Sequence, residues 1–174
     1  MSEATKSNNK QNVIDNLKSK LLNDVFGQDE AVNKVTDKLL IYYNGLGDEG
    51  KPIGSFIFTG PTGVGKTELA KSLAKNLDMN LIRFDMSEYT SEHSLSTLIG
   101  GAAGLVGYDS GGLLTNAVLK NPKSILLFDE IEKADKKVLN IFLQILDYGI
   151  LTSTKGAKVS FRESIIIFTS NNNQ

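Results

Sequence analysis

One stretch constrains the fold of this chain more than any other: residues 60–67, which read GPTGVGKT. They fit the pattern G-x-x-x-x-G-K-[ST], in which glycines let backbone N–H groups turn inward and cradle phosphate oxygens. The pattern has this meaning only between a strand and a helix. Here an apolar run at residues 55–59 precedes the loop, and helical spacing follows at residues 66–77. The sequence therefore predicts a phosphate-binding loop in a strand–loop–helix unit.

Short apolar runs alternate with helical patterns along the rest of the chain. The runs predict buried strands at residues 55–59, 81–84, 125–128 and 165–168. The helical patterns lie at residues 13–22, 31–43, 66–77, 113–120 and 136–146, and the glycine-rich residues 100–112 predict a mobile loop. Buried strands separated by helices imply an α/β fold, and we expect a P-loop NTPase with a parallel five-stranded sheet between helices.

The chain divides into three expected parts. Residues 1–12 have almost nothing to bury and predict a disordered tail or leader. Residues 13–54 hold two predicted helices and the segment between them. Residues 55–174 form the expected α/β core. A chain of 174 residues is long enough to bury such a core as one domain.

Two acids follow the third apolar run directly. A buried strand delivers Asp129 and Glu130 to the carboxyl edge of the sheet, where ligands of open α/β folds bind. Asp129 suits a role in holding Mg²⁺, and Glu130 suits the general base that orients an attacking water. Asn171 comes just past the last strand, which we expect beside the strand of Asp129. An ordinary helix N-cap and an ordinary loop asparagine are the structural alternatives.

These positions predict a site for ATP or ADP with Mg²⁺. Lys66 would reach the β- and γ-phosphates, and the Thr67 hydroxyl would bind Mg²⁺ together with Asp129. The catalytic residues expected are Glu130 and Asn171. The residues expected to bind nucleotide in and after the loop are Gly60, Thr62, Gly63, Val64, Gly65, Lys66, Thr67 and Glu68.

Composition excludes several other kinds of chemistry. Nineteen basic against twenty acidic residues leave a net charge of −1, without the broad basic footprint of a general nucleic-acid binder. Cysteine is absent, which excludes disulfides, a thiol nucleophile and a cysteine-built zinc site. The lone His93 is expected to be an ordinary polar helix residue. No stretch is apolar enough to span a membrane and no secretory signal is present, so we expect a cytoplasmic protein.

Several longer motifs accompany the loop: VFGQD (25–29), GPTGVGKTELAK (60–71), RFDMSEY (83–89), GGLLTNAV (111–118), LLFDEIEKA (126–134) and FTSN (168–171). Together they resemble the Clp family of bacterial AAA+ unfoldases, over nearly all of residues 20–172. The likeness is to the large α/β subdomain of the second ATPase module. Residues 83–89 and 111–115 look more like ClpA than like the disaggregase ClpB.

The resemblance implies partners as well as an activity. Family members form hexameric rings that hydrolyse ATP and thread unfolded or tagged proteins through a central pore toward a ClpP-type peptidase. It implies no partner among nucleic acids or membranes. It also makes Val25 and Phe26, with the two residues that follow, the lining of the adenine pocket, and Asn171 the sensor-one residue.

The chain departs from the family pattern in its pore loop. The family loop usually reads Gly-Tyr-Val-Gly, whereas this chain has Gly104-Leu105-Val106-Gly107. Leu105 keeps the bulk of tyrosine but loses its flat ring, so we expect a weaker grip or an altered substrate preference.

The resemblance also bears on where the chain stops. Family members continue through a peptidase-docking loop, an arginine finger and a helical lid. The arginines of this chain, Arg83 and Arg162, stand at neither arginine position of those parts. We therefore expect a nucleotide pocket without its lid, and weak or no hydrolysis by this chain alone.

Three alternatives stay open at this point. One is a nucleotide-dependent binding module without turnover. Another is a chaperone ATPase of the ClpB or ClpC kind. A DNA-directed clamp or helicase loader is the third, and the near-neutral charge argues against it.

Overall fold

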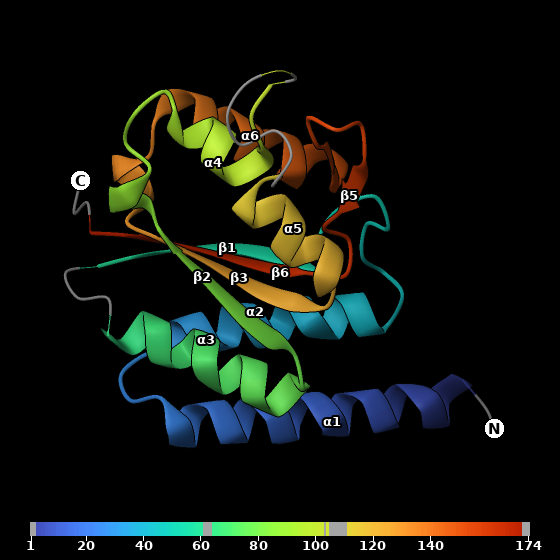
Figure 1. The fold of residues 1–174 in the computed structure, drawn as a ribbon. Helices are drawn as coiled ribbons and strands as arrows, with labels where there is room; N and C mark the ends of the chain where they lie inside the picture. The colour runs from blue at the N-terminus through green and yellow to red at the C-terminus, as the bar shows by residue number, and fades with distance from the viewer. Residues whose placement is uncertain (1–2, 61–63, 103, 105–110, 172–174) are drawn as a thin grey trace.

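A parallel sheet forms the centre of the molecule. The structure is a computed structural model, and it describes residues 3–60, 64–102, 104 and 111–171 (Figure 1). The strands of the sheet, in their spatial order, are β1 (Gly54–Thr59), β6 (Ile165–Ser170), β3 (Ser124–Asp129) and β2 (Asn80–Asp85). The α/β class and the parallel direction are confirmed. The described residues form a sheet of four strands, however, where we expected five.

Helices cover both faces of the sheet, as Figure 1 shows. On one face lie α1 (Glu3–Asp24), α2 (Asp29–Tyr43) and α3 (Val64–Leu77). On the other face lie α4 (Ser94–Ile99), α5 (Leu113–Lys120) and α6 (Lys136–Tyr148). Short 3-10 turns follow two of the strands, η1 (Met86–Glu88) after β2 and η2 (Ile131–Lys133) after β3. The two helical layers explain why the strands read as continuous apolar runs.

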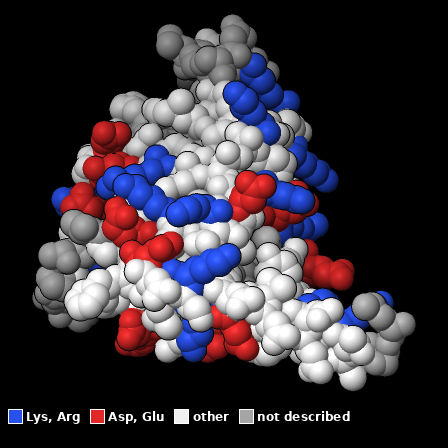
Figure 2. Space-filling model, turned by 90° about the horizontal axis from the view of Figure 1, so that it is seen from below, with Lys and Arg blue, Asp and Glu red and all other residues white. Residues whose placement is uncertain are grey.

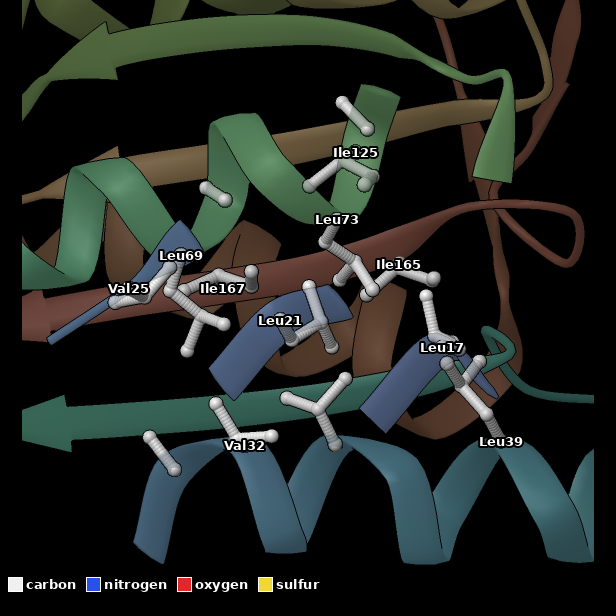
Figure 3. Packing of buried hydrophobic residues seen from close by; sticks show 14 of the residues in the cluster. Leu17, Leu21, Val25, Val32, Leu39, Leu69, Leu73, Ile125, Ile165 and Ile167 are labelled. Carbon is white, nitrogen blue, oxygen red and sulfur yellow. The ribbon is translucent and has the colours of Figure 1, made fainter. Parts of the chain in front are cut away.

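The side chains of β3 alternate between two hydrophobic clusters. Ile125 and Leu127 pack with α1, α2 and α3, whereas Leu126 and Phe128 pack with α4, α5 and α6. Figure 3 shows the first cluster, where leucines and valines of the three helices meet isoleucines of β3 and β6. Fully burying each such side chain stabilises the fold by about 1.5–3 kcal/mol, so the central strand is anchored from both sides.

A small hairpin stands outside the main sheet and is missing from our expectations. Strands β4 (Ile150–Thr152) and β5 (Lys158–Ser160) pair in antiparallel fashion after α6. Gly149 ends α6 in a left-handed conformation with φ 64°, which suits glycine and turns the chain into β4. The hairpin is held to the second cluster by Leu151 and Val159, both buried.

The N-terminal segment differs from our expectation. We predicted a disordered tail over residues 1–12, but the chain is helical from Glu3 onward. Ile14, Leu17 and Leu21 are buried against the core and hold the later turns of α1 in place. The exposed first turns continue that helix, with support such as the 3.0 Å bond from Gln11 Nε2 to Asp15 Oδ1.

Charged side chains of both signs share the molecular surface. Figure 2 shows basic and acidic residues interspersed on one face. Some of them form exposed pairs along a helix, such as Lys34 with Glu30 at 3.3 Å. Among the described residues, no helix is long and apolar enough to cross a membrane.

Candidate nucleotide-binding site

The carboxyl ends of the strands meet at one edge of the sheet. The parallel register pairs Asp85 with Asp129 and Thr59 with Ser170. The residues that follow three of these strand ends are therefore neighbours: Gly60 after β1, Glu130 after β3 and Asn171 after β6. This is the edge at which open α/β sheets bind ligands.

A cleft of about 450 Å³ opens at this edge. Its lining residues are Thr67, Glu68, Arg83, Asp85, Asp129, Glu130, Thr169 and Asn171. Both expected metal ligands and both expected catalytic residues thus line one cleft, although they come from separate parts of the chain.

Lys66 lies at the start of α3 with its side chain buried. Its Nζ donates to the carbonyl oxygens of Gly60, at 3.0 Å, and Ser170, at 3.1 Å. Those bonds to described residues use two of the three N–H donors of an ammonium group. Burial lowers the pKa of Lys66, while the carboxylates of Glu132 and Asp129 act in the opposite direction. The ammonium is thereby aimed at the strand ends, where a phosphate would lie.

Asp129 is held from two sides. Its carboxyl side chain is 8% exposed, and Oδ1 accepts a 2.9 Å bond from the Thr169 hydroxyl. Oδ2 accepts from the Nε of Arg83. The hydroxyl of Thr169 also accepts a 3.2 Å bond from the backbone N–H of Glu130, so one side chain of β6 orders both acids.

Glu130 adopts a left-handed backbone conformation, with φ 56° and ψ 52°. For a non-glycine residue this costs about 1–2 kcal/mol, and such strain clusters at functional sites. Its Oε1 accepts from Lys133 Nζ at 3.1 Å and from Asn171 Nδ2 at 3.5 Å. The backbone N–H of Asn171 donates to Glu132 Oε1 at 3.3 Å, which ties the end of β6 to turn η2.

A second cleft of about 330 Å³ has Lys66 and Gly60 in its lining. Gly27 and Gln28 line it, in the segment expected to bind adenine. The two residues to which we gave that role are placed differently: the side chain of Val25 is buried in the core, and that of Phe26 is fully exposed. Neither of them is among the described residues that line this cleft.

Several expected site residues lie outside the described residues, and for Val64 only the backbone is described. Thr62 and Gly63 lie outside the described residues, as do Leu105, Val106 and Gly107 of the expected pore loop. The backbone of Val64 begins α3. At Gly65 an added Cβ would lie 2.8 Å from Gln28 Nε2, so the absence of a side chain lets Gln28 approach the start of α3 closely.

The structure adds functional residues that the sequence analysis missed. Arg83 and Thr169 contact Asp129, and Lys133 contacts Glu130. The available signal was slight: Arg83 interrupts the apolar run of β2, and Thr169 directly follows the apolar run of β6. Arg83 lies exposed on the edge strand β2 and Thr169 lies buried on β6, and both bond the acid at the end of β3.

The fold and the site define a P-loop nucleotide-binding domain. A strand–loop–helix unit carries the buried Lys66, and the acids of β3 face it across the sheet edge. Thr67 and Asp129 supply the hydroxyl and carboxylate oxygens that Mg²⁺ prefers, so the residues present fit a magnesium–nucleotide site.

Comparison with known proteins places the domain in a family. A model of the AAA domain (Cdc48 subfamily) matches residues 51–174. The chain belongs to this family of ATP-binding domains.

Individual relatives carry the name chaperone protein ClpB. That of Clostridium perfringens is 58% identical over 158 residues, covering 89% of this chain and 18% of the relative. That of Prochlorococcus marinus is 55% identical over the same shares of each chain. That of Lactococcus lactis subsp. cremoris is 55% identical over 150 residues, covering 84% of this chain and 17% of the relative. The chain thus spans less than a fifth of the length of these curated relatives.

These names correct part of the sequence analysis. The likeness to the Clp family holds, but a specific likeness to ClpA is not supported. The comparisons favour the chaperone alternative, and they give no support for a ClpP-type peptidase as a partner.

Proposed function

We propose that this chain is the ATP-binding and ATP-hydrolysing domain of a chaperone similar to ClpB. One observation carries the proposal: Thr67, Asp129, Glu130 and Asn171 line one cleft at the sheet edge, and the buried Lys66 bonds the Ser170 carbonyl at the same edge. A phosphate-binding lysine alone would suit many nucleotide-binding proteins. The two acids and the amide beside it are the groups that hydrolysis of a phosphoanhydride requires.

Each of these groups has a definite task in the proposed site. The ammonium of Lys66 and the backbone N–H groups of the loop bind the phosphates. Thr67 and Asp129 hold Mg²⁺, which neutralises charge on the phosphate oxygens when it is bound. In the described part of the chain, no three acids or histidines lie together so that they could hold one metal ion. Such a cluster is not needed, because magnesium at nucleotide sites is held by one or two side chains together with the phosphates.

Glu130 orients the attacking water and accepts its proton. Its carboxylate is anchored by Lys133 and lies within reach of the Asn171 amide, so both contacts define where the water binds. Asn171 is tied to turn η2 through its backbone, and its side chain can therefore report the state of the γ-phosphate to the turn that carries Glu130.

The partners of the protein are part of the same proposal. We expect assembly into a ring of identical copies and protein substrates that contact residues 104–107. We do not propose a peptidase partner, because the relatives are named chaperones.

Nucleotide binding by this chain tests the first half of the proposal. Lys66→Gln removes the buried ammonium, and we expect at least a tenfold loss of affinity for a fluorescent ATP analogue with Mg²⁺. Lys71→Gln is the matched control, because Lys71 is on the same helix but half-exposed, and among the described residues its ion pair is with Glu68, at 3.4 Å. Equal affinity in the two variants would refute the assigned site.

Hydrolysis tests the second half, in the protein that carries this chain. Glu130→Gln should bind ATP normally and hydrolyse it about 10²–10⁴-fold more slowly, the usual contribution of a general base. Hydrolysis at the wild-type rate would refute the role of Glu130. Binding without any turnover in the wild-type protein would instead favour the nucleotide-dependent binding module.

A further inference from the structure

We propose that Arg83 is a positioning residue that orients the carboxylate of Asp129 toward Mg²⁺, an inference that rests on the magnesium–nucleotide site proposed above. From the sequence alone, Arg83 has no role beyond its strand. In the structure it is the arginine that lines the cleft and the one that contacts the proposed metal ligand.

The contact is set by the pairing of two neighbouring strands. In the register of β2 and β3, Arg83 stands opposite Leu127 and Asp85 opposite Asp129. Arg83 is thus two residues before the strand end, and its long side chain extends to the edge, where Nε donates to Asp129 Oδ2. The guanidinium is 55% exposed, whereas the carboxylate is only 8% exposed. Arg83 therefore reaches a buried acid from the open side of the cleft.

Two donors together determine the orientation of this carboxylate. The Thr169 hydroxyl binds Oδ1 from β6, and Arg83 binds Oδ2 from β2. Because the two donors come from the strands on either side of β3, rotation of the carboxyl group breaks at least one bond. A carboxylate has about four lone-pair positions, and these two bonds leave others for a metal or its water ligands. Arg83 can therefore stay in place when the site is loaded.

The charge of the cleft supports the same role. Glu68, Asp85, Asp129 and Glu130 all line it, and Arg83 is the basic residue among its described lining. A buried carboxyl group that lacks a charged partner is strongly disfavoured, and the guanidinium of Arg83 supplies that partner for Asp129. Arginine suits this task because it stays protonated and its Nε has a fixed direction.

The test separates positioning from a merely structural ion pair. A merely structural ion pair with one exposed partner would contribute little to stability and would leave metal binding unchanged. The readout is therefore the ratio of two dissociation constants of a fluorescent ADP analogue, one with EDTA and one with saturating Mg²⁺. This ratio measures how strongly the protein couples nucleotide to metal, and it needs no hydrolysis.

For Arg83→Gln we expect the coupling ratio to fall about 10–100-fold, the usual effect of losing a residue that orients a metal ligand. Affinity in EDTA should change by less than about twofold. Arg83→Lys keeps the charge without the directed Nε donor, and we expect it to restore part of the ratio. Lys71→Gln removes one cation beside Glu68, without touching Asp129, and should leave the ratio unchanged. Thermal unfolding checks that every variant is folded.

A double-mutant cycle of Arg83→Gln with Asp129→Asn shows whether Arg83 acts through that carboxylate. In the Asp129→Asn background, Arg83→Gln should have no further effect on the ratio.

Each contrary result overturns the inference. An unchanged coupling ratio in Arg83→Gln would show that Arg83 and Asp129 form a structural ion pair and nothing more. A raised ratio would show that Arg83 competes with the metal for Asp129. Equal losses with and without Mg²⁺ mean that Arg83 binds phosphate directly. A wild-type protein that shows no Mg²⁺-dependent nucleotide binding would refute the proposed function itself, which distinguishes that failure from the failure of this inference.

Discussion

The hydroxyl of Thr169 joins the two acids of the site, and its removal is the sharpest test of how the sheet edge is held. Its Oγ1 donates to Asp129 Oδ1 at 2.9 Å and accepts from the Glu130 backbone N–H at 3.2 Å. Thr169 is 4% exposed, so water does not readily replace these bonds. Valine has nearly the same shape without the hydroxyl. Thr169→Val therefore removes both bonds and leaves the packing almost unchanged.

The expected cost follows from the two bonds. A hydrogen bond to a charged group contributes about 1.5–3 kcal/mol, and one between neutral groups about 0.5–1.5 kcal/mol. We therefore expect Thr169→Val to lower the free energy of unfolding by about 2–4 kcal/mol. With a urea m-value of about 2 kcal/mol/M, the midpoint of unfolding falls by about 1–2 M. Urea titration followed by circular dichroism measures this shift.

Thr169→Ser is the matched control, because it keeps the hydroxyl and removes one methyl group. Its expected cost is only about 1 kcal/mol. If Thr169→Val were as stable as the wild type, or if serine cost more than valine, the methyl group rather than the hydroxyl would hold the edge. Either result would refute the reasoning.

Two further predictions concern backbone packing and pH. At Gly112 an added Cβ would lie 2.2 Å from a backbone carbonyl oxygen, so Gly112→Ala should cost about 1–3 kcal/mol or more in urea unfolding. Gly47→Ala, whose nearest contact is 3.5 Å, should be nearly neutral. Bonds from the Ser87 hydroxyl and then its backbone N–H hold the pKa of Asp85 below its usual value. That contact stabilises the fold above the unfolded pKa of about 4 and is lost as the pH falls through the lower folded value. Ser87→Ala should therefore destabilise the protein near neutral pH, and a difference that did not shrink in acid would contradict this origin.

The elements with strong local signals were predictable. The run at residues 125–128 is apolar at every position, and β3 is buried along its whole length. The helix expected at residues 113–120 is α5, with Leu113–Lys120 as its bounds. The strand is buried on both faces of the sheet, and the helix ends at a clear stop signal, so few alternative structures compete in either segment.

Other elements carried no sufficient local signal. The strands of the hairpin have three residues each, too few to show a period, and Leu151 and Val159 pair only because both are buried in the second cluster. The first turns of α1 are polar and exposed, so nothing in their composition predicts order. They continue a helix whose later turns have Ile14 and Leu17 buried in the core.

The sequence by itself determined the loop at residues 60–67 and the acids at the end of the third apolar run, because both depend on neighbours in the chain. Only the tertiary structure decided which side chains meet those acids. Thr169 and Arg83 are 40 and 46 residues away from Asp129 along the chain. They meet it because the register of three parallel strands brings these side chains to one edge, and a shift of one residue would turn them to the opposite face.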